Sequence, residues 1–513
     1  MAEAGLPPSD RVPSIAERMN GLTPTRRHRL IVGTVGLALF FDMFEIFMSG
    51  VLGAVLTQQF DLTRTQTSAV LASVFVGMFI GVLVTGRLAD RFGRRRVMLG
   101  AVAVYTVFSA VGAMSPDASM VIGARFLAGL GIGPVLPLAD SYLSDMLPAR
   151  YRGRYTAWAY TVGFVGVPTV GLMARWVVPL SPLGLDGWRW LFLIGSVGGL
   201  LVLSLRRTLL ESPRWLASLG RTAEAEAALR ELGGAPKSAA SPPTEESAAG
   251  ASQHAEPGAG RALATGEAVR ALLRSPVYRR RVGMMTVFHL LQAFGGYGFG
   301  TMAPLVLAAK GYSIVHSLLF SAVTFLGYPL GSLLSLPLIE RVERKYLIVG
   351  AALAMAASGV LFGSADSELT VVLAGLCYTA VSNVFSNSYH VYQAEIFPTA
   401  LRVTAVSWTY SLSRITTAAM PFLLVPVLDD FGSGVLFTLV AVTLGIIALD
   451  IGLLGPATTG RALEAVNESL AAFHPAAGAP GGRRRAKSTT GRSPGDEEGR
   501  HSSENGVDAM KSP

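Results

Sequence analysis

The stretch that decides the fold, residues 86–96, reads GRLADRFGRRR and separates two apolar runs, 67–88 and 96–114. Apolar runs of about 20 residues, long enough to cross a bilayer as helices, recur from residue 30 to residue 455. Inside lipid the backbone groups must pair with one another, so such runs form helices or closed barrels. Their lack of strict alternation excludes a barrel. The sequence therefore predicts an all-α membrane protein.

The composition supports this prediction and excludes other classes. Of the 513 residues, 51% are hydrophobic and 15% are charged, whereas soluble proteins carry about 25% charge. The net charge of +9 comes from loops that flank the apolar runs, so no nucleic-acid partner is expected. The single cysteine, Cys377, is interpreted as a small buried apolar residue. Without a phosphate loop, nucleophile motif or metal cluster, we expect no enzyme activity, no cofactor and no metal.

The apolar runs predict about twelve spans in two sets of six. The first set is placed at 30–56, 67–88, 96–114, 119–145, 154–175 and 188–206. The second set is placed at 282–308, 314–340, 346–364, 369–395, 403–428 and 434–455.

Three polar segments complete the predicted domain organisation. A short segment, 1–29, precedes the first six-helix bundle, 30–210, and a central loop, 211–281, precedes the second bundle, 282–455. The central loop contains a stretch rich in Pro, Gly, Ser and Ala, and the tail, 456–513, is similar; neither is apolar enough to pack a core, so the tail is predicted to be disordered. Within the loop, 266–277 is predicted to form a short amphipathic surface helix.

The loops alternate in charge. One set carries clusters of Arg and Lys, for example at 91–96, 150–154 and 341–345, and the alternate set carries mostly Asp, as at 429–430. By the positive-inside rule, both termini and the central loop are cytoplasmic. We expect a multi-pass protein of the plasma (inner) membrane with the lipid bilayer as a partner, present as a monomer.

The chain also repeats itself at an offset of 250 residues. GRLADRFGRRR falls on LPLIERVERKY (336–346), and SYLSDMLPARYRG (141–153) falls on VYQAEIFPTALRV (391–403). Arg94 then meets Arg344, Asp145 meets Glu395, and Tyr160 meets Tyr410. Two homologous six-span halves are typical of transporters that hold substrate between halves that rock.

These motifs resemble the major facilitator superfamily. GRLADRFGRRR is similar to its best-known loop motif, and RFLAGLGIG (125–133) to its span-4 Arg-Gly motif. SDMLPARYRGR, ESPRWL (211–216) and AEIFPTALR (394–402) resemble the sugar-porter branch and its organic-ion and aromatic-acid relatives. The resemblance covers about residues 25–455 and implies alternating-access transport.

The loop charges are interpreted as a gate. Asp90 with Arg91 and Arg94 is expected to form charge-assisted bonds to the ends of neighbouring helices, bonds that favour one gate position. The alternative is a solvated positive-inside loop. Glu343, where the first copy has Gly93, predicts a different turn. The predicted gating residues are Gly86, Asp90, Arg91, Gly93, Arg94, Asp145, Arg152, Glu211, Arg214, Glu340, Arg341, Glu395 and Arg402.

Charges at bilayer depth are costly and usually functional. Asp42 and Glu45 lie near the midplane of the first span on one helix face, and Arg125 lies in the fourth span. We predict that these three residues couple transport to protons, because desolvation and a nearby Arg act in opposite directions on a carboxylate. The resemblance implies the same roles, with Glu45 in place of the second Asp of the aromatic-acid relatives. The alternative is that the acids only hold two helices together.

Arg414, near the midplane of the eleventh span, favours an anionic substrate, because a guanidinium holds a carboxylate bidentately. The alternative is an internal salt bridge to Asp42 or Glu45. For His289 the alternative is a helix–helix hydrogen bond. The predicted substrate-binding residues are His289, Gln292, Tyr297, Asn383, Asn387 and Arg414.

The sequence therefore predicts a secondary transporter for proton-coupled uptake of a small organic or aromatic acid, with protons and this small molecule as partners. Because no nucleotide-binding site is found, an ion gradient must supply the energy. A sugar:proton symporter and a proton-driven efflux antiporter remain alternatives, the latter resting on GFVGVPTVG (163–171). A non-transporting sensor on the same fold is the alternative of a different class.

Overall fold

The computed structural model describes residues 13–233, 274–397 and 399–459, without the side chains of residues 87, 90, 340, 399–404, 407 and 408. The described residues belong to one compact unit, Met1–Glu468. The elements within them are all helical, which confirms the predicted fold class. The predicted surface helix at 266–277 lies outside the described residues up to 273, and its last residues begin the first helix of the second set.

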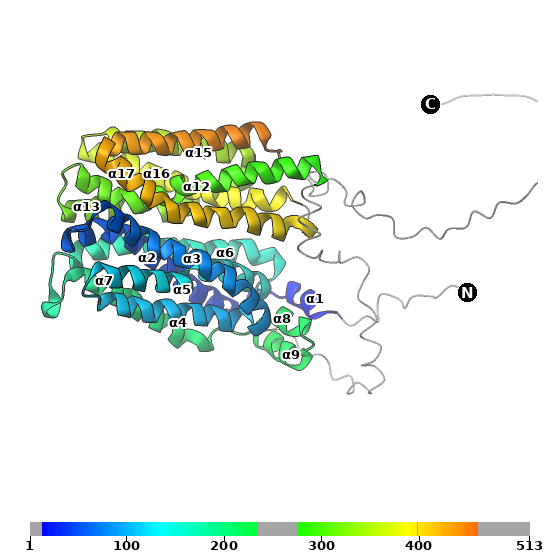
Figure 1. Ribbon diagram of the computed structural model, residues 1–513. Coiled ribbons are helices and arrows are strands. Elements are labelled where there is room, and N and C mark those ends of the chain that lie inside the picture. The colour runs from blue at the N-terminus through cyan, green and yellow to red at the C-terminus, as the bar shows by residue number, and fades with distance from the viewer. Residues whose placement is uncertain (1–12, 234–273, 398, 460–513) are drawn as a thin grey trace, which may run out of the picture. The chain divides into compact units, whose positions relative to one another are not determined.

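Two sets of long helices run side by side (Figure 1). The first set is α2 (Arg26–Gln59), α3 (Arg64–Phe92), α4 (Arg94–Ala113), α5 (Ala118–Met146), α6 (Ala149–Val177) and α7 (Gly187–Ser204). The second is α12 (Pro276–Ala309), α13 (Ile314–Phe325), α14 (Gly327–Arg341), α15 (Arg344–Ser364), α16 (Glu368–Glu395) and α17 (Thr399–Leu454).

The described residues contain 11 helical stretches long and apolar enough to span a membrane. α13 and α14 together form one of them. α17 has 56 residues, about twice what a bilayer requires, and its helical dihedrals break at Gly432 (φ 79°). α17 therefore accounts for two passages, and about twelve spans result as predicted. The helices extend past the predicted ends because they continue beyond the lipid; α2, for example, has 34 residues.

Three short helices pack together at one end of the first set: α1 (Ile15–Asn20), α8 (Pro213–Ser218) and α9 (Thr222–Glu231) (Figure 1). Trp215, Leu216 and Ala225 form their small core. The first part of the predicted central loop is thus helical, because it has apolar side chains to bury. Two 3-10 turns, at Pro182–Gly184 and Leu205–Arg207, flank α7.

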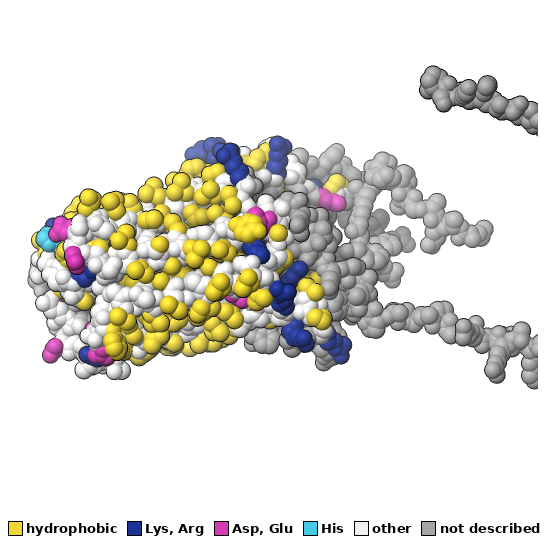
Figure 2. All heavy atoms as spheres, turned by 90° about the horizontal axis from the view of Figure 1, so that it is seen from above, with side chains coloured by type: hydrophobic (Ala, Val, Ile, Leu, Met, Phe, Trp, Pro, Cys, Tyr) yellow, Lys and Arg dark blue, Asp and Glu magenta, His cyan; other side chains and the backbone are white. Residues whose placement is uncertain are grey.

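The two ends of the spans differ in charge. Figure 2 shows Lys and Arg side chains gathered mainly at one end and acidic side chains at the other, with hydrophobic side chains between them. We call the end where α3 meets α4 the arginine-rich end and the end that carries Asp429 and Asp430 the acidic end. This distribution is the one expected of a chain that crosses a membrane many times.

The sequence repeat is visible as a repeated ion pair. Arg94 Nε lies 3.6 Å from Asp145 Oδ2, and Arg344 Nε lies 3.3 Å from Glu395 Oε1, at the same offset of the sequence repeat. The turns before the two arginines differ as predicted, since Gly93 has φ +94° and Glu343 has φ −58°. The left-handed backbone at Gly93 explains why glycine stands there.

The described contacts between the two sets cluster toward the acidic end. Arg64 on α3 lies 3.1 Å from Asp429 and 2.6 Å from Asp430 on α17, and Ser68 donates to the Pro421 carbonyl at 3.2 Å. α2 and α12 touch backbone to backbone, because a Cβ on Gly50 would lie only 2.6 Å from the Gly300 oxygen. The two sets are therefore joined at this end.

One prediction about the surface is wrong. Cys377 on α16 is exposed rather than buried. Leu373, one helical turn earlier, is 53% exposed, so this face of α16 points outward from the helices. An apolar run gives no periodic signal that separates a lipid-facing from a core-facing position.

Candidate functional site

A buried ion pair lies inside the first set of helices. Arg125 on α5 donates from one terminal nitrogen to Glu45 Oε2 at 2.7 Å and from the other to the Glu45 carbonyl at 2.5 Å. Its Nε donates to the Ser49 hydroxyl at 2.9 Å, and Ser109 on α4 donates to Glu45 Oε1 at 2.5 Å. Gly195 on α7 leaves room for the carboxylate. Such full pairing is what allows two charges to stay buried.

Asp42 lies on the same helix but is not paired. Its side chain is fully buried, and neither carboxylate oxygen accepts a hydrogen bond from any residue that the structure describes. The nearby Tyr105 hydroxyl on α4 is also buried without a described partner. A buried unpaired carboxylate is destabilising unless it is protonated or finds a partner in another state. Protonation therefore lowers the free-energy cost of burial more for Asp42 than for the paired Glu45.

Arg414 on α17 faces this region from the second set. It is 2% exposed and donates to the hydroxyls of Tyr297 at 3.2 Å and Tyr410 at 3.0 Å, while its Nε has no described hydrogen-bond partner. The described ion pairs include none between Arg414 and Asp42 or Glu45, so the alternative of an internal salt bridge for Arg414 is wrong for this structure. The charge of Arg414 still acts on Asp42 through space.

Aromatic rings surround Arg414. Its guanidinium lies 5.2 Å from the Tyr410 ring centre and 5.7 Å from that of Tyr297. His289 lies 5.4 Å from the Tyr410 ring, and His390 stacks on Tyr389 at 4.2 Å. Such rings offer flat apolar surfaces beside a cation, an arrangement suited to a planar organic anion.

The other predicted binding residues mostly bond within the second set. Asn383 donates to the Tyr328 carbonyl at 2.5 Å, Asn387 to the Ser335 hydroxyl at 2.7 Å, and His289 Nε2 lies 3.1 Å from Gln393 Oε1. Gln292, on the same helix as Tyr297, is 3% exposed. The structure thus brings Tyr297 and Arg414 together directly and places Asn383 and Asn387 in helix–helix contacts. A substrate role for all of these residues stays a prediction.

The sequence did not single out several residues of this centre as binding residues. Tyr160 on α6 lies near Asp140 on α5, close enough also to interact electrostatically with Asp42 and Tyr410. The signal for Tyr160 and Tyr410 was available, because they meet in the internal repeat. No sequence signal distinguishes Tyr389 or Ser109 from the packing residues of a long helix.

The predicted gating residues lie at the arginine-rich end. Glu211 accepts from the Arg95 backbone N–H at 3.2 Å and stands directly against Gly93. Ser212 donates to Asp145 at 3.0 Å, and Arg214 donates to the Asn20 amide oxygen at 2.8 Å. These contacts involve only the first set and the short helices beside it.

The other predicted gating residues have few described contacts. Arg91 and Arg341 are exposed, and Gly86 has open space around its α-carbon. The Nε of Arg152 is buried without a described partner. Asp90, Glu340 and Arg402 lie outside the described side chains, so a gate role for all of these residues remains a prediction.

A family model described as "Sugar (and other) transporter" matches residues 26–470. The chain belongs to this family. It is a transporter of the major facilitator superfamily, and the family and its curated relatives are transporters rather than enzymes.

Relatives and a solved structure agree with this assignment. The niacin transporter NiaP of Acinetobacter baylyi is 26% identical over 457 residues, covering 88% of this chain and 99% of that protein. The 4-hydroxybenzoate transporter PcaK of the same organism is 26% identical over 395 residues, covering 76% and 83%. A partially occluded, inward-open structure of the xylose transporter XylE from E. coli matches the fold with a TM-score of 0.68 at 22% identity, covering 85% of this transporter and all of XylE.

Proposed function

We propose that this transporter couples the uptake of a small aromatic or other organic acid to protons, with Arg414 as the carboxylate-binding residue. The observation that carries the proposal is the pairing of Arg414 with two tyrosine hydroxyls in an aromatic enclosure, opposite the unpaired carboxylate of Asp42. A guanidinium that is not neutralised by a protein carboxylate is available to a substrate carboxylate. Niacin and 4-hydroxybenzoate, the substrates in the names of two relatives, are acids of this kind.

We further propose that the arginine-rich end faces the cytoplasm and that the structure is open toward it. The contacts between the two sets cluster at the acidic end. Near the arginine-rich end, Asp140 and His390 are exposed although each lies within a long helix, which supports a solvent-filled entrance there. The orientation follows from the positive-inside rule in a plasma membrane.

In the proposed cycle, Asp42 carries the proton. Protonation removes a buried charge and lowers the cost of enclosing this centre. Substrate carboxylate then binds Arg414 between the tyrosine rings. When the transporter opens to the less acidic side, Asp42 loses the proton, and the through-space attraction between Asp42 and Arg414 competes with the substrate for the cation.

Substitution of Arg414 by Gln tests the anion site. We expect binding of benzoate or nicotinate to weaken by about 1.5–3 kcal/mol, the range for a charge-assisted hydrogen bond, which is roughly 10- to 150-fold in Kd. Binding to the purified protein is measured by calorimetry. Arg281→Gln is the matched control, because Arg281 is also buried but donates to the Ile396 carbonyl at 2.6 Å.

The outcome separates the two substrate classes. If benzoate, nicotinate and related carboxylates do not bind the unmodified protein and xylose does, the chain is a sugar carrier and the acid proposal fails. If carboxylates bind equally well to the Arg414 variant and to the Arg281 control, the site lies elsewhere.

Removing the two ion pairs of Arg64 should raise the fraction of molecules that are open at the acidic end. Exposed ion pairs contribute about 0.2–1 kcal/mol each, so removing both pairs with Arg64→Ala should raise the population open at that end by roughly two- to thirtyfold. The readout is alkylation of Ser68→Cys, a buried position at the same interface, in a Cys377→Ser background. Arg175→Ala is the control, because the described ion pairs include none for Arg175. Equal alkylation rates in both variants would show that Arg64 does not hold this end closed.

A further inference from the structure

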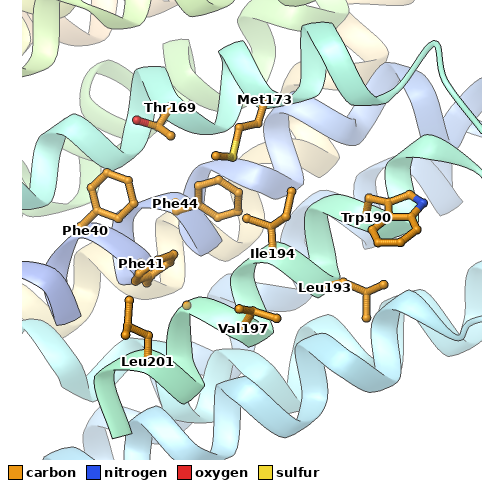
Figure 3. A pocket seen from close by; sticks show the side chains of 11 residues that line it. Phe40, Phe41, Phe44, Thr169, Met173, Trp190, Leu193, Ile194, Val197 and Leu201 are labelled. Carbon is orange, nitrogen blue, oxygen red and sulfur yellow. The ribbon is translucent and has the colours of Figure 1, made fainter. Parts of the chain in front are cut away.

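A groove that belongs neither to the central site nor to the gate opens on the side of the first set of helices. It has a volume of about 300 Å³ and lies between α2, α6 and α7. Figure 3 shows the rings of Phe40, Phe41 and Phe44 from α2 between the side chains of α6 and α7. Gly198 on α7 lets the Phe41 ring approach, because any Cβ there would overlap it.

The groove is open to the side and apolar. Val197 and Leu201 on its rim are 63% and 48% exposed. Its one hydroxyl, on Thr169, already donates to the Val165 carbonyl at 2.7 Å. Between Leu201 and Trp190, its two ends on α7 (Figure 3), the helix rises about 16 Å. Trp190 lies three residues after the first residue of α7 and Leu201 three residues before its last, so the groove runs across the middle of the helix.

Each of the three helices that line the groove, α2, α6 and α7, has an exposed arginine on it or directly after it at the arginine-rich end. Arg29 lies three helical turns before Phe40 on the same face of α2, with the exposed Gly33 between them. Arg154 lies about four turns before Thr169 on α6, and Arg206 follows α7 directly. Described ion pairs include none for these three arginines.

The chain segments that carry Arg29 and Arg206 meet in space. The start of α2 touches the turn after α7, because Arg27 donates to the Arg207 carbonyl at 3.1 Å. Arg95 at the start of α4 donates to the Arg206 carbonyl at 2.9 Å. Positive charge is therefore concentrated at the arginine-rich ends of α2 and α7, the level at which lipid headgroups lie.

We propose that this groove and its arginines bind one anionic phospholipid of the leaflet at the arginine-rich end. The acyl chain lies over the phenylalanines of α2, and the phosphate is held by Arg29, Arg154 and Arg206. An apolar chain alone has no preference for this groove over bulk lipid, whereas a phosphate among unpaired arginines does. The site is independent of the substrate site, because the two share none of their residues.

Native mass spectrometry of the purified full chain tests the proposal with phosphatidylglycerol and phosphatidylcholine of identical acyl chains. We expect phosphatidylglycerol to be retained preferentially, and Arg29→Gln or Arg206→Gln each to lower its retention about fivefold. Val197→Phe, which fills the groove, should lower retention as well. Arg279→Gln and Leu353→Phe are matched controls at an exposed arginine of the same end and an exposed leucine of α15.

Tryptophan fluorescence locates the acyl chain. Phosphatidylglycerol brominated on its acyl chain should quench a tryptophan placed in the groove by Phe40→Trp, its signal obtained as the difference from the unmodified chain. Folding of each variant is checked by its melting temperature. Equal retention of the two lipids, equal losses in the Arg206 and Arg279 variants, or an unquenched tryptophan at position 40 would each overturn the proposal.

Discussion

Replacing Asp42 with Asn is expected to abolish accumulation of substrate against its gradient while leaving substrate exchange across the membrane intact. Asn keeps the shape of the side chain but cannot carry a proton. Because Asp42 accepts no described hydrogen bond, the substitution removes none of these. With one proton per substrate, a pH difference of one unit drives about tenfold accumulation, and the variant should fall to equal concentrations on both sides.

Proteoliposomes containing the purified protein provide the measurement, with uptake under a pH gradient and counterflow at equal pH as the two assays. Asp450→Asn is a suitable control, because Asp450 is another acid on a membrane-spanning helix, on α17. Uphill uptake by the Asp42 variant at the unmodified level would show that another group carries the proton. Loss of counterflow together with uptake would place Asp42 in substrate binding instead.

The second large effect is expected on stability. Arg125→Met leaves the Glu45 carboxylate buried with only Ser109 as a described donor, and removing one partner of a buried pair costs about 3–5 kcal/mol. The melting temperature in detergent should fall clearly at neutral pH. The deficit should shrink at low pH, because a protonated Glu45 no longer carries an uncompensated charge.

The double variant Glu45→Gln with Arg125→Met is the matched control. It removes both charges, so most of the stability lost in the single variant should return. A single variant as stable as the unmodified protein, or a double variant less stable than Arg125→Met alone, would mean that the pair does not stabilise the fold. The result also separates the structural from the coupling role of Glu45.

Much of the fold could be predicted from the sequence. Apolar runs set the number of spans because lipid leaves the backbone no other choice. The repeat aligned Arg94 with Arg344 and Asp145 with Glu395, and both ion pairs are present. The repeat aligned these residues without pairing them, and the two ion pairs are a finding of the structure.

The division of roles between the two acids could not be predicted. Residues three apart share one helix face, but their side chains still differ by about 60° around the axis. That angle turns Glu45 toward Ser109 and Arg125 and leaves Asp42 without a described partner. Likewise, the surroundings of Arg414 depend on three helices, α12, α16 and α17, whose rotation no single stretch of sequence fixes.

The backbone contact of Gly50 with Gly300 divides α2 into a long segment and a short segment. About 36 Å of helix lies between Gly50 and Arg26, but only about 14 Å between Gly50 and Gln59. A rotation of α2 by about 10° around this contact would move Arg26 by roughly 6 Å and Gln59 by roughly 2 Å. The entrance at the acidic end would thus open less widely than the other, so the upper limit on substrate size would be set there.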